Sequence, residues 1–230
     1  MKKYKIVLFD LDHTLWDYDR NSKETLQELY DFHQINNYKI AFDDFHNAFQ
    51  KTNISLWDLY DTGKIDRHVI RNDRFPLVLK ELLVVNNDLA RALSDHYFEL
   101  SPTKKHLVSN ALEVLNYLQN KYPMLLVTNG FEKMQSGKAE SSGIRKYFQE
   151  IITSERAGHK KPSKEIFEFA LNQSGFANHE AIMIGDNLLT DMAGATNASI
   201  DSVLYNPKET QHTSMVTHEI KDLIELTGIL

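Results

Sequence analysis

The chain has 230 residues, which is enough for one large domain or for a domain that carries a smaller inserted one. Its formal net charge of -6 argues against binding to nucleic acid polymers, because that affinity is built from clustered lysine and arginine. It contains no cysteine, so disulfides, thiolate zinc sites and a thiol nucleophile are excluded. The first apolar run, Ile6 to Phe9, is too short for a membrane span or a signal peptide, and we expect a cytoplasmic protein with no membrane partner.

Short apolar runs predict the strands of a sheet. The first run is Tyr4 to Phe9. Similar runs follow at Met124 to Val127, Glu150 to Thr153, Ala181 to Ile184 and Ser202 to Tyr205. Helix-like stretches separate the runs, and alternating strands and helices indicate a parallel sheet. We expect one helix to begin after Ser163, and we interpret His218 to Leu226 as one closing amphipathic helix.

Residues 16–102 interrupt this alternation. They show several amphipathic patterns, such as the apolar face of Leu26, Leu29 and Tyr30, and no convincing strand. We therefore expect an all-helical insertion that forms a lid, with the sheet domain assembled from residues 1–15 and 103–230.

The first strand ends at Asp10, and Asp12 follows where the chain leaves the sheet. A carboxylate can attack phosphorus and form a phosphorylated aspartate, and a second carboxylate can then carry protons. Asp10 suits the first role and Asp12 the second. Because like charges lie close together, we expect the pKa of Asp12 to be raised, which would help it carry a proton. The alternative is a strand end followed by an ordinary aspartate turn.

Two later segments carry groups that suit an anion. Thr128-Asn129-Gly130 places a hydroxyl before backbone N–H groups in a tight turn, which is how a nest for phosphate oxygens is built. Lys161 stands before Pro162 near the start of a helix and can direct a cation toward the site. Taken one at a time, an Asn-Gly turn and a solvated lysine are the simpler interpretations.

More carboxylates follow the strand that ends at Ile184. Gly185-Asp186 comes directly after it, and Asp191 lies at the start of the next helix. Magnesium prefers oxygen ligands and usually retains water, so carboxylates that converge around an open side suit it better than zinc. The sequence therefore predicts a Mg²⁺ site.

Four short motifs, taken in order, resemble those of the haloacid dehalogenase superfamily. They are Asp10-Leu11-Asp12-His13-Thr14, Thr128-Asn129, Lys161-Pro162, and Gly185-Asp186 with Asp191. The resemblance implies an α/β fold, with a Rossmann-like parallel sheet core and an inserted all-helical cap domain. It also implies phosphate chemistry, because the branch that cleaves carbon–halogen bonds generally lacks the second aspartate, here Asp12.

The same resemblance suggests a role for each motif residue. It implies that Asp10 is the nucleophile and a metal ligand, and that Asp12 is the general acid and base and a metal ligand through its carbonyl. The other implied roles are phosphate binding by Thr128, Asn129, Gly130 and Lys161, catalysis by Lys161, and metal binding by Asp186 and Asp191.

A second resemblance concerns the substrate. The segments Leu56 to Tyr60, Gly63-Lys64-Ile65, Arg71, Arg74-Phe75 and Gly130-Phe131 look like parts of a subfamily of pyrimidine 5'-nucleotidases. The implied substrate is a small phosphorylated metabolite, a nucleoside monophosphate. A nucleobase stacks well on an aromatic ring, and the candidate rings are Trp16, Tyr18, Trp57 and Tyr60. The alternative for Trp57 and Tyr60, which lie at helical spacing, is packing between cap helices.

Other functions stay open from the residues alone. A sugar-phosphate or other metabolite phosphatase, or a phosphomutase, could use the same core with a different cap pocket. A phosphate-binding protein without turnover is disfavoured, because every motif residue that the chemistry needs is present. His13 and His159 flank the motifs, but neither has a helical partner four residues away, and we assign them no role.

Overall fold

The computed structural model describes residues 4–230 and divides into two compact units. The core unit contains the N-terminal segment through Tyr18 together with Lys105–Leu230, and the cap unit is Asp19–Lys104. The insertion predicted at 16–102 corresponds to the cap unit, whose limits lie a few residues later in the chain. Within residues 4–230, none of the helices has the length and apolar character needed to cross a bilayer.

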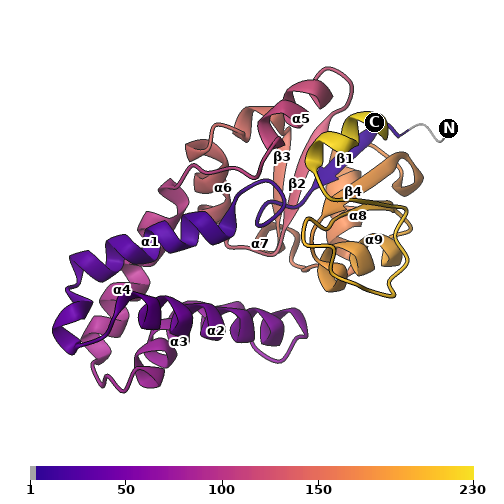
Figure 1. Cartoon of the computed structure of the whole chain (residues 1–230). Coiled ribbons are helices and arrows are strands. Elements are labelled where there is room, and N and C mark those ends of the chain that lie inside the picture. Colours follow the sequence, from indigo (N-terminus) through magenta and orange to yellow (C-terminus); the bar gives the residue numbers. More distant parts are fainter. Residues whose placement is uncertain (1–3) are drawn as a thin grey trace. The chain divides into compact units, whose positions relative to one another are not determined.

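The core unit is built on one parallel sheet of six strands (Figure 1). Its strands are β1 (Ile6–Phe9), β2 (Met124–Thr128), β3 (Glu150–Thr153), β4 (Ala181–Gly185), β5 (Asp201–Tyr205) and β6 (His218–Ile220). They are paired in the order β3-β2-β1-β4-β5-β6. All of the predicted strands are present close to their expected limits, and β6 is an addition to them. The predicted α/β fold is confirmed.

Strand β1 lies inside the sheet, paired with β2 on one side and β4 on the other. Its side chains alternate between two hydrophobic clusters, Val7 and Phe9 in one, and Ile6 and Leu8 in the other. A strand that is buried on both faces has a continuous apolar sequence, which explains the uninterrupted apolar run from Ile6 to Phe9. Because all pairs are parallel, the residues that follow β1, β2 and β4 meet at one edge of the sheet.

Helices cover both faces of this sheet. Those of the core unit are α5 (Ala111–Leu118), α6 (Glu132–Ser141), α7 (Ser154–Ala157), α8 (Lys164–Ser174) and α9 (Ala193–Asn197). Helix α5 contributes Val114 and Leu115 to one hydrophobic cluster, and α8 contributes Ile166 and Phe167 to the other. Ser163 occupies the N-cap position of α8, so the predicted start of that helix is confirmed.

The prediction of one closing helix over His218 to Leu226 is wrong. Residues His218–Ile220 form β6, and a 3₁₀ helix, η6, follows at Leu223–Gly228. Ile220 is buried where β6 pairs with the edge strand β5. Leu223 and Leu226 are also buried, and their three-residue spacing fits the three residues per turn of a 3₁₀ helix. The apolar spacing that suggested an α-helix thus belongs to two different elements.

The cap unit is helical throughout, as predicted. Four α-helices account for most of it: α1 (Tyr18–Phe32), α2 (Phe42–Asp61), α3 (Arg67–Glu81) and α4 (Asn87–Leu100). Asp66 accepts a hydrogen bond from the N–H of His68 and caps α3, and Asn86 caps α4 through the N–H of Leu89. Phe49, Phe75 and Tyr97 bring α2, α3 and α4 together, with ring centroids 5.2–5.7 Å apart.

Candidate active site

Asp10 lies directly after β1, at the edge of the sheet where the parallel strands end. Its N–H donates to the carbonyl of Ile184 in β4, at 2.9 Å, which fixes the backbone beside the neighbouring strand end. Its carboxylate oxygen Oδ1 lies 2.5 Å from Nζ of Lys161. The sheet therefore places the predicted nucleophile next to a cation.

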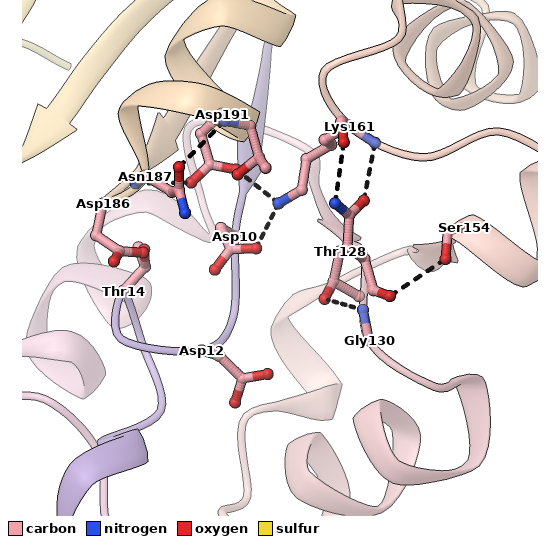
Figure 2. Close-up of polar contacts among 12 residues, drawn as sticks. Asp10, Asp12, Thr14, Thr128, Gly130, Ser154, Lys161, Asp186, Asn187 and Asp191 are labelled. Carbon is pink, nitrogen blue, oxygen red and sulfur yellow. Dashed lines mark hydrogen bonds and ion pairs between the residues drawn. The ribbon is translucent and has the colours of Figure 1, made fainter. Parts of the chain in front are cut away.

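Lys161 connects two carboxylates. Its Nζ also donates to Oδ1 of Asp191 at 2.6 Å, and its side chain is only 2% exposed (Figure 2). Burial by itself lowers the pKa of Lys161, but the negative charges of Asp10 and Asp191 outweigh burial and raise that pKa above its usual range. Lys161 therefore carries its positive charge at neutral pH.

The backbone of Lys161 is fixed by Asn129. The side-chain oxygen of Asn129 accepts from the N–H of Lys161 at 2.8 Å, and its amide nitrogen donates to the Lys161 carbonyl at 3.0 Å. The side chain of Asn129 is thus engaged in positioning Lys161. Phosphate binding by Asn129 stays a prediction, and it now concerns the backbone N–H of this residue.

Thr128 and Gly130 form a compact turn at the end of β2. The N–H of Gly130 donates to the hydroxyl of Thr128 at 3.1 Å (Figure 2). A Cβ on Gly130 would lie 1.6 Å from Nε2 of Gln135, so this position has no room for a side chain while Gln135 keeps its place. The turn has the form expected of a phosphate nest, and binding of phosphate there stays a prediction.

Three carboxylates meet at the edge of the sheet. Oxygen atoms of Asp10, Asp186 and Asp191 lie within 4.8 Å of one another. Asp186 follows β4 and accepts a hydrogen bond from the hydroxyl of Thr14 at 3.1 Å. Asp191 lies close against Gly185, where a Cβ would be 2.3 Å from Oδ2 of Asp191. We call Asp10, Asp186 and Asp191 the carboxylate cluster.

The carboxylate cluster is electrostatically costly without a cation. Burial raises the pKa of Asp10 well above its usual value, and Asp191 and Asp186 raise it further against the opposing effect of Lys161. Burial and the charge of Asp191 raise the pKa of Asp186 to about 6. The positive charge of Lys161 alone therefore does not neutralise the carboxylate cluster. The carboxylate oxygens of the cluster are ligands that suit a hard divalent cation.

Asp12 faces a different set of partners. Its Oδ1 accepts from Nζ of Lys138 at 2.6 Å, and its Oδ2 accepts from Nε2 of Gln135 at 2.8 Å. Both partners belong to α6. Figure 2 shows the Asp12 carboxylate apart from the Asp10–Lys161–Asp191 group.

The expectation that the pKa of Asp12 is raised is therefore wrong. Burial does raise this pKa, but the charge of Lys138 and the hydrogen bonds from Lys138 and Gln135 lower it by more, so the net pKa is below its usual value. The nearby charge that lowers the pKa of Asp12 most is the positive charge of Lys138. The negative charge of Asp10 does not determine the direction of the shift. Asp12 is a carboxylate at rest.

Lys138 and Gln135 were missed in the sequence. They lie three residues apart on α6, and in a helix as polar as this one such residues have the pattern of a solvated face. Both are buried, at 3% and 2% exposure. The one available signal was their position in the helix directly after the Thr128-Asn129-Gly130 turn.

The aromatic candidates are dispersed. Trp16 is fully buried in the hydrophobic core of the core unit, so its prediction as a substrate contact is wrong for this structure. Tyr18 is half-buried and lies against the exposed ring of His13, with centroids 4.7 Å apart. In the cap unit, Trp57 and Tyr60 pack edge to face at 5.6 Å, and Tyr60 is buried. Packing inside the cap therefore accounts for Tyr60.

The core unit is a Rossmann-like sheet that carries a helical insertion after its first strand. Its edge combines a lysine-paired aspartate with further carboxylates, an arrangement typical of a class of hydrolases. The family model for haloacid dehalogenase-like hydrolases matches residues 4–199 of this chain. The chain belongs to the haloacid dehalogenase-like hydrolases.

Relatives match along the whole chain. It is 29% identical to the HAD-hydrolase YfnB of Bacillus subtilis, over 100% of this chain and 97% of that protein. It is 30% identical to the pyrimidine 5'-nucleotidase PynA of Streptococcus pneumoniae, over 99% of this chain and 95% of PynA. It is also 30% identical to the ribulose-1,5-bisphosphate 5-phosphatase of Halopiger xanaduensis, over 97% and 98%.

A crystal structure of YfnB bound to magnesium has the same fold, with a TM-score of 0.89 over 99% of each chain. The predicted superfamily is thus confirmed. The family model and the phosphatase relatives also confirm the predicted enzyme class, a phosphoric monoester hydrolase. Its substrate is accordingly a small phosphorylated compound.

Proposed function

We propose that this chain hydrolyses small phosphate monoesters in two steps through a phosphorylated Asp10, with pyrimidine nucleoside 5'-monophosphates as preferred substrates. The observation that carries the proposal is the buried ion pair of Asp10 and Lys161, 2.5 Å apart at the sheet edge. An anionic nucleophile reaches an anionic phosphate only where positive charge offsets the repulsion. Lys161 brings such a charge to the nucleophile.

In the first step, Asp10 attacks phosphorus. Its Oδ1 is bound by Lys161, which leaves Oδ2 to form the new P–O bond while the bond from phosphorus to the ester oxygen breaks. The departing oxygen leaves as an alcohol and needs one proton. A phosphate monoester has a second pKa of about 6 and can bring that proton itself, and Asp12 transfers it to the departing oxygen.

In the second step, water attacks the phosphorylated Asp10. Asp12, a carboxylate at rest, takes a proton from the attacking water as the P–O bond to Asp10 breaks. Inorganic phosphate leaves, takes the proton from Asp12, and Asp10 returns to a free carboxylate. The donors of the Thr128–Gly130 turn and Lys161 bind the phosphate oxygens throughout.

We propose Mg²⁺ as the cofactor. The residues fit it, because the carboxylate cluster brings oxygen atoms of Asp10, Asp186 and Asp191 within 4.8 Å of one another and raises the pKa of Asp10 and Asp186. These three residues would bind the ion, with the backbone carbonyl of Asp12 beside them. When bound, magnesium supplies positive charge to the phosphate oxygens. The carboxylate of Asp12 is engaged with α6 and stays outside this ligand set.

The choice of nucleotide rests on PynA, which matches 99% of this chain at 30% identity. A stacking surface for a base is available in the core unit, where the rings of His13 and Tyr18 lie 4.7 Å apart next to Asp12. A sugar phosphate is the second candidate, because the ribulose-1,5-bisphosphate 5-phosphatase matches at the same identity.

Phosphate release from a panel of nucleoside monophosphates and sugar phosphates, with MgCl₂ and with EDTA, tests the proposal. We expect metal-dependent release that is fastest with pyrimidine monophosphates. Faster release from sugar phosphates would keep the chemistry and replace the substrate class. A positional isomer in place of free phosphate would indicate a mutase, and no turnover of any ester would indicate a binding protein.

A further inference from the structure

Asp12 is bound at both of its carboxylate oxygens by one helix. Lys138 donates to Oδ1 at 2.6 Å and Gln135 donates to Oδ2 at 2.8 Å. The two donors lie three residues apart on α6, which places them on the same face of the helix. We call Gln135 and Lys138 the α6 pair.

Lys138 is fixed from more than one direction. Its side chain is 4% exposed, and Nζ lies 4.3 Å from the ring centroid of Trp16 and 5.6 Å from that of Tyr18. A cation between a carboxylate and aromatic faces is stabilised by both, and a buried lysine has little freedom to turn away. Trp16 thus contacts the lysine that binds Asp12.

Gln135 packs closely against the turn that follows β2. Its amide nitrogen occupies the space beside Gly130 that a Cβ would fill, at 1.6 Å. Gly130 in turn donates to the hydroxyl of Thr128. The α6 pair is therefore connected both to Asp12 and to the turn proposed to bind phosphate.

Without these partners, the carboxylate of Asp12 could adopt other orientations. Asp12 stands two residues from Asp10, and its side chain turns about two single bonds, so a cation at the carboxylate cluster would attract it. Binding each oxygen to a different donor removes that freedom. The carboxylate stays directed toward α6 and apart from the cluster.

We propose that Gln135 and Lys138 are positioning residues for departure of the alcohol, because they fix the Asp12 carboxyl group where it meets the ester oxygen. The inference rests on the proposed function, and specifically on the role of Asp12 in the first step. It predicts that loss of the α6 pair lowers kcat/KM most for esters whose leaving group needs a proton, and least for esters whose leaving group is stable without one.

Two esters separate this role from a structural one. An alkyl phosphate, the best substrate of the panel, expels an alkoxide that needs a proton, whereas p-nitrophenyl phosphate expels a phenolate that is stable without one. The value of kcat/KM reports steps through departure of the leaving group, so it isolates the first step. The variant is Lys138→Met, and Lys133→Met is the matched control, since Lys133 is an exposed lysine of the same helix.

We expect Lys138→Met to lower kcat/KM for the alkyl ester by about 100-fold, the lower end of what a positioned acid contributes, with a much smaller loss for p-nitrophenyl phosphate. Lys133→Met should retain wild-type values on both esters. In an Asp12→Asn background, Lys138→Met should add nothing to the difference between the esters.

Equal losses on both esters would overturn the inference and leave the proposed function intact. A wild-type protein that hydrolyses neither ester would overturn the proposed function and this inference with it. If Lys138→Met does not fold, Gln135→Met gives the same test, because it removes the other donor without removing a charge. An unchanged ratio of the two kcat/KM values in Gln135→Met would then be decisive against the α6 pair.

Discussion

Asp10 and Asp12 stand two residues apart, and each is paired with a buried lysine, yet the two pairs differ in what surrounds them. Lys161 lies between Asp10 and Asp191, with Asp186 nearby. Lys138 binds the carboxylate of Asp12, and Gln135 adds a neutral donor. Burial raises the pKa of both aspartates. The net pKa of Asp10 is raised and that of Asp12 is lowered.

The difference shows that the ratio of carboxylates to cations decides the direction of these shifts. Three carboxylates that share one lysine carry excess negative charge, which a metal ion can neutralise. One carboxylate with its own lysine and an amide carries no such excess. The first arrangement suits a nucleophile in a metal site, and the second suits a group that exchanges protons beside it.

We call Asp10–Lys161 the first pair and Asp12–Lys138 the second pair. Of the substitutions in these pairs, Asp10→Asn should have the largest effect on activity. The substitution retains the shape and removes the nucleophile, and loss of a nucleophile lowers kcat by about 10⁴-fold or more. Phosphate release with MgCl₂ measures the effect, and circular dichroism checks that the variant is folded. Activity within tenfold of the wild type, a loss of about 1.4 kcal/mol, would remove Asp10 from the mechanism.

Lys161→Met should lower the free energy of unfolding more than Lys138→Met does. Removing one member of a buried ion pair leaves uncompensated charge and costs about 3–5 kcal/mol. Lys138→Met should cost less, because Asp12 keeps Gln135 and is more exposed than Asp10, at 24% against 10% of the side chain. Urea unfolding in EDTA at pH 7 gives both values.

Equal losses of unfolding free energy in the two variants would contradict the charge argument. MgCl₂ serves as the internal control, since it should restore stability to Lys161→Met more than to Lys138→Met.

The pH dependence of stability sharpens the comparison further. The pKa of Asp186 is raised from 3.8 to about 6 in the folded, metal-free protein. The folded state therefore binds this proton more tightly than the unfolded chain, so its stabilising contribution is complete below pH 3.8 and is lost as the pH rises through 6. We expect this group to lower the unfolding free energy by about 2–3 kcal/mol across that interval.

Thermal unfolding in EDTA across this interval measures the loss, and MgCl₂ at pH 7 should reverse it. Asp186→Asn is the matched control, because an amide does not titrate and should flatten the profile. If wild type and Asp186→Asn show the same dependence of stability on pH, the pKa of Asp186 is not raised by burial and by its neighbours.

The first pair was accessible from the sequence and the second was not. Asp10, Thr128 and Asp186 each follow a buried apolar run, and parallel strands bring such ends together, so local patterns place these three residues at one edge of the sheet. The role of Lys161 comes from the resemblance of the Lys161-Pro162 motif. The contact between Asp12 and Lys138 spans 126 residues, and the polar sequence of α6 gives no sign that one face of it is buried. Burial by distant segments was the missing information.

The same reason explains the other differences. Trp16 follows the first motif, and an aromatic residue there suggests a substrate contact, but the isolated bridge between Trp16 and Leu107 draws it into the core. The strand His218–Ile220 is too short to show an alternating pattern and exists because β5 offers an edge for pairing. In both cases a partner far along the chain decides the local structure.

The smallest expected effect comes from the glycine behind the second pair. In Gly130→Ala the new Cβ would meet Nε2 of Gln135, the far end of a flexible side chain, so Gln135 can turn away and release one oxygen of Asp12. Losing one hydrogen bond costs about 1 kcal/mol, which corresponds to about a fivefold loss of kcat/KM. We expect that loss with the alkyl ester and little change with p-nitrophenyl phosphate.

Gly185→Ala is the matched change behind the first pair, and it should behave differently. The new Cβ would lie 2.3 Å from Oδ2 of Asp191 and 2.7 Å from its Cβ, so the Asp191 backbone itself must move and Lys161 loses a fixed partner. Because Lys161 serves the nucleophile, both esters should slow together. If Gly130→Ala also slows both esters equally, Gly130 serves the phosphate-binding turn, and the link from that turn through Gln135 to Asp12 is refuted.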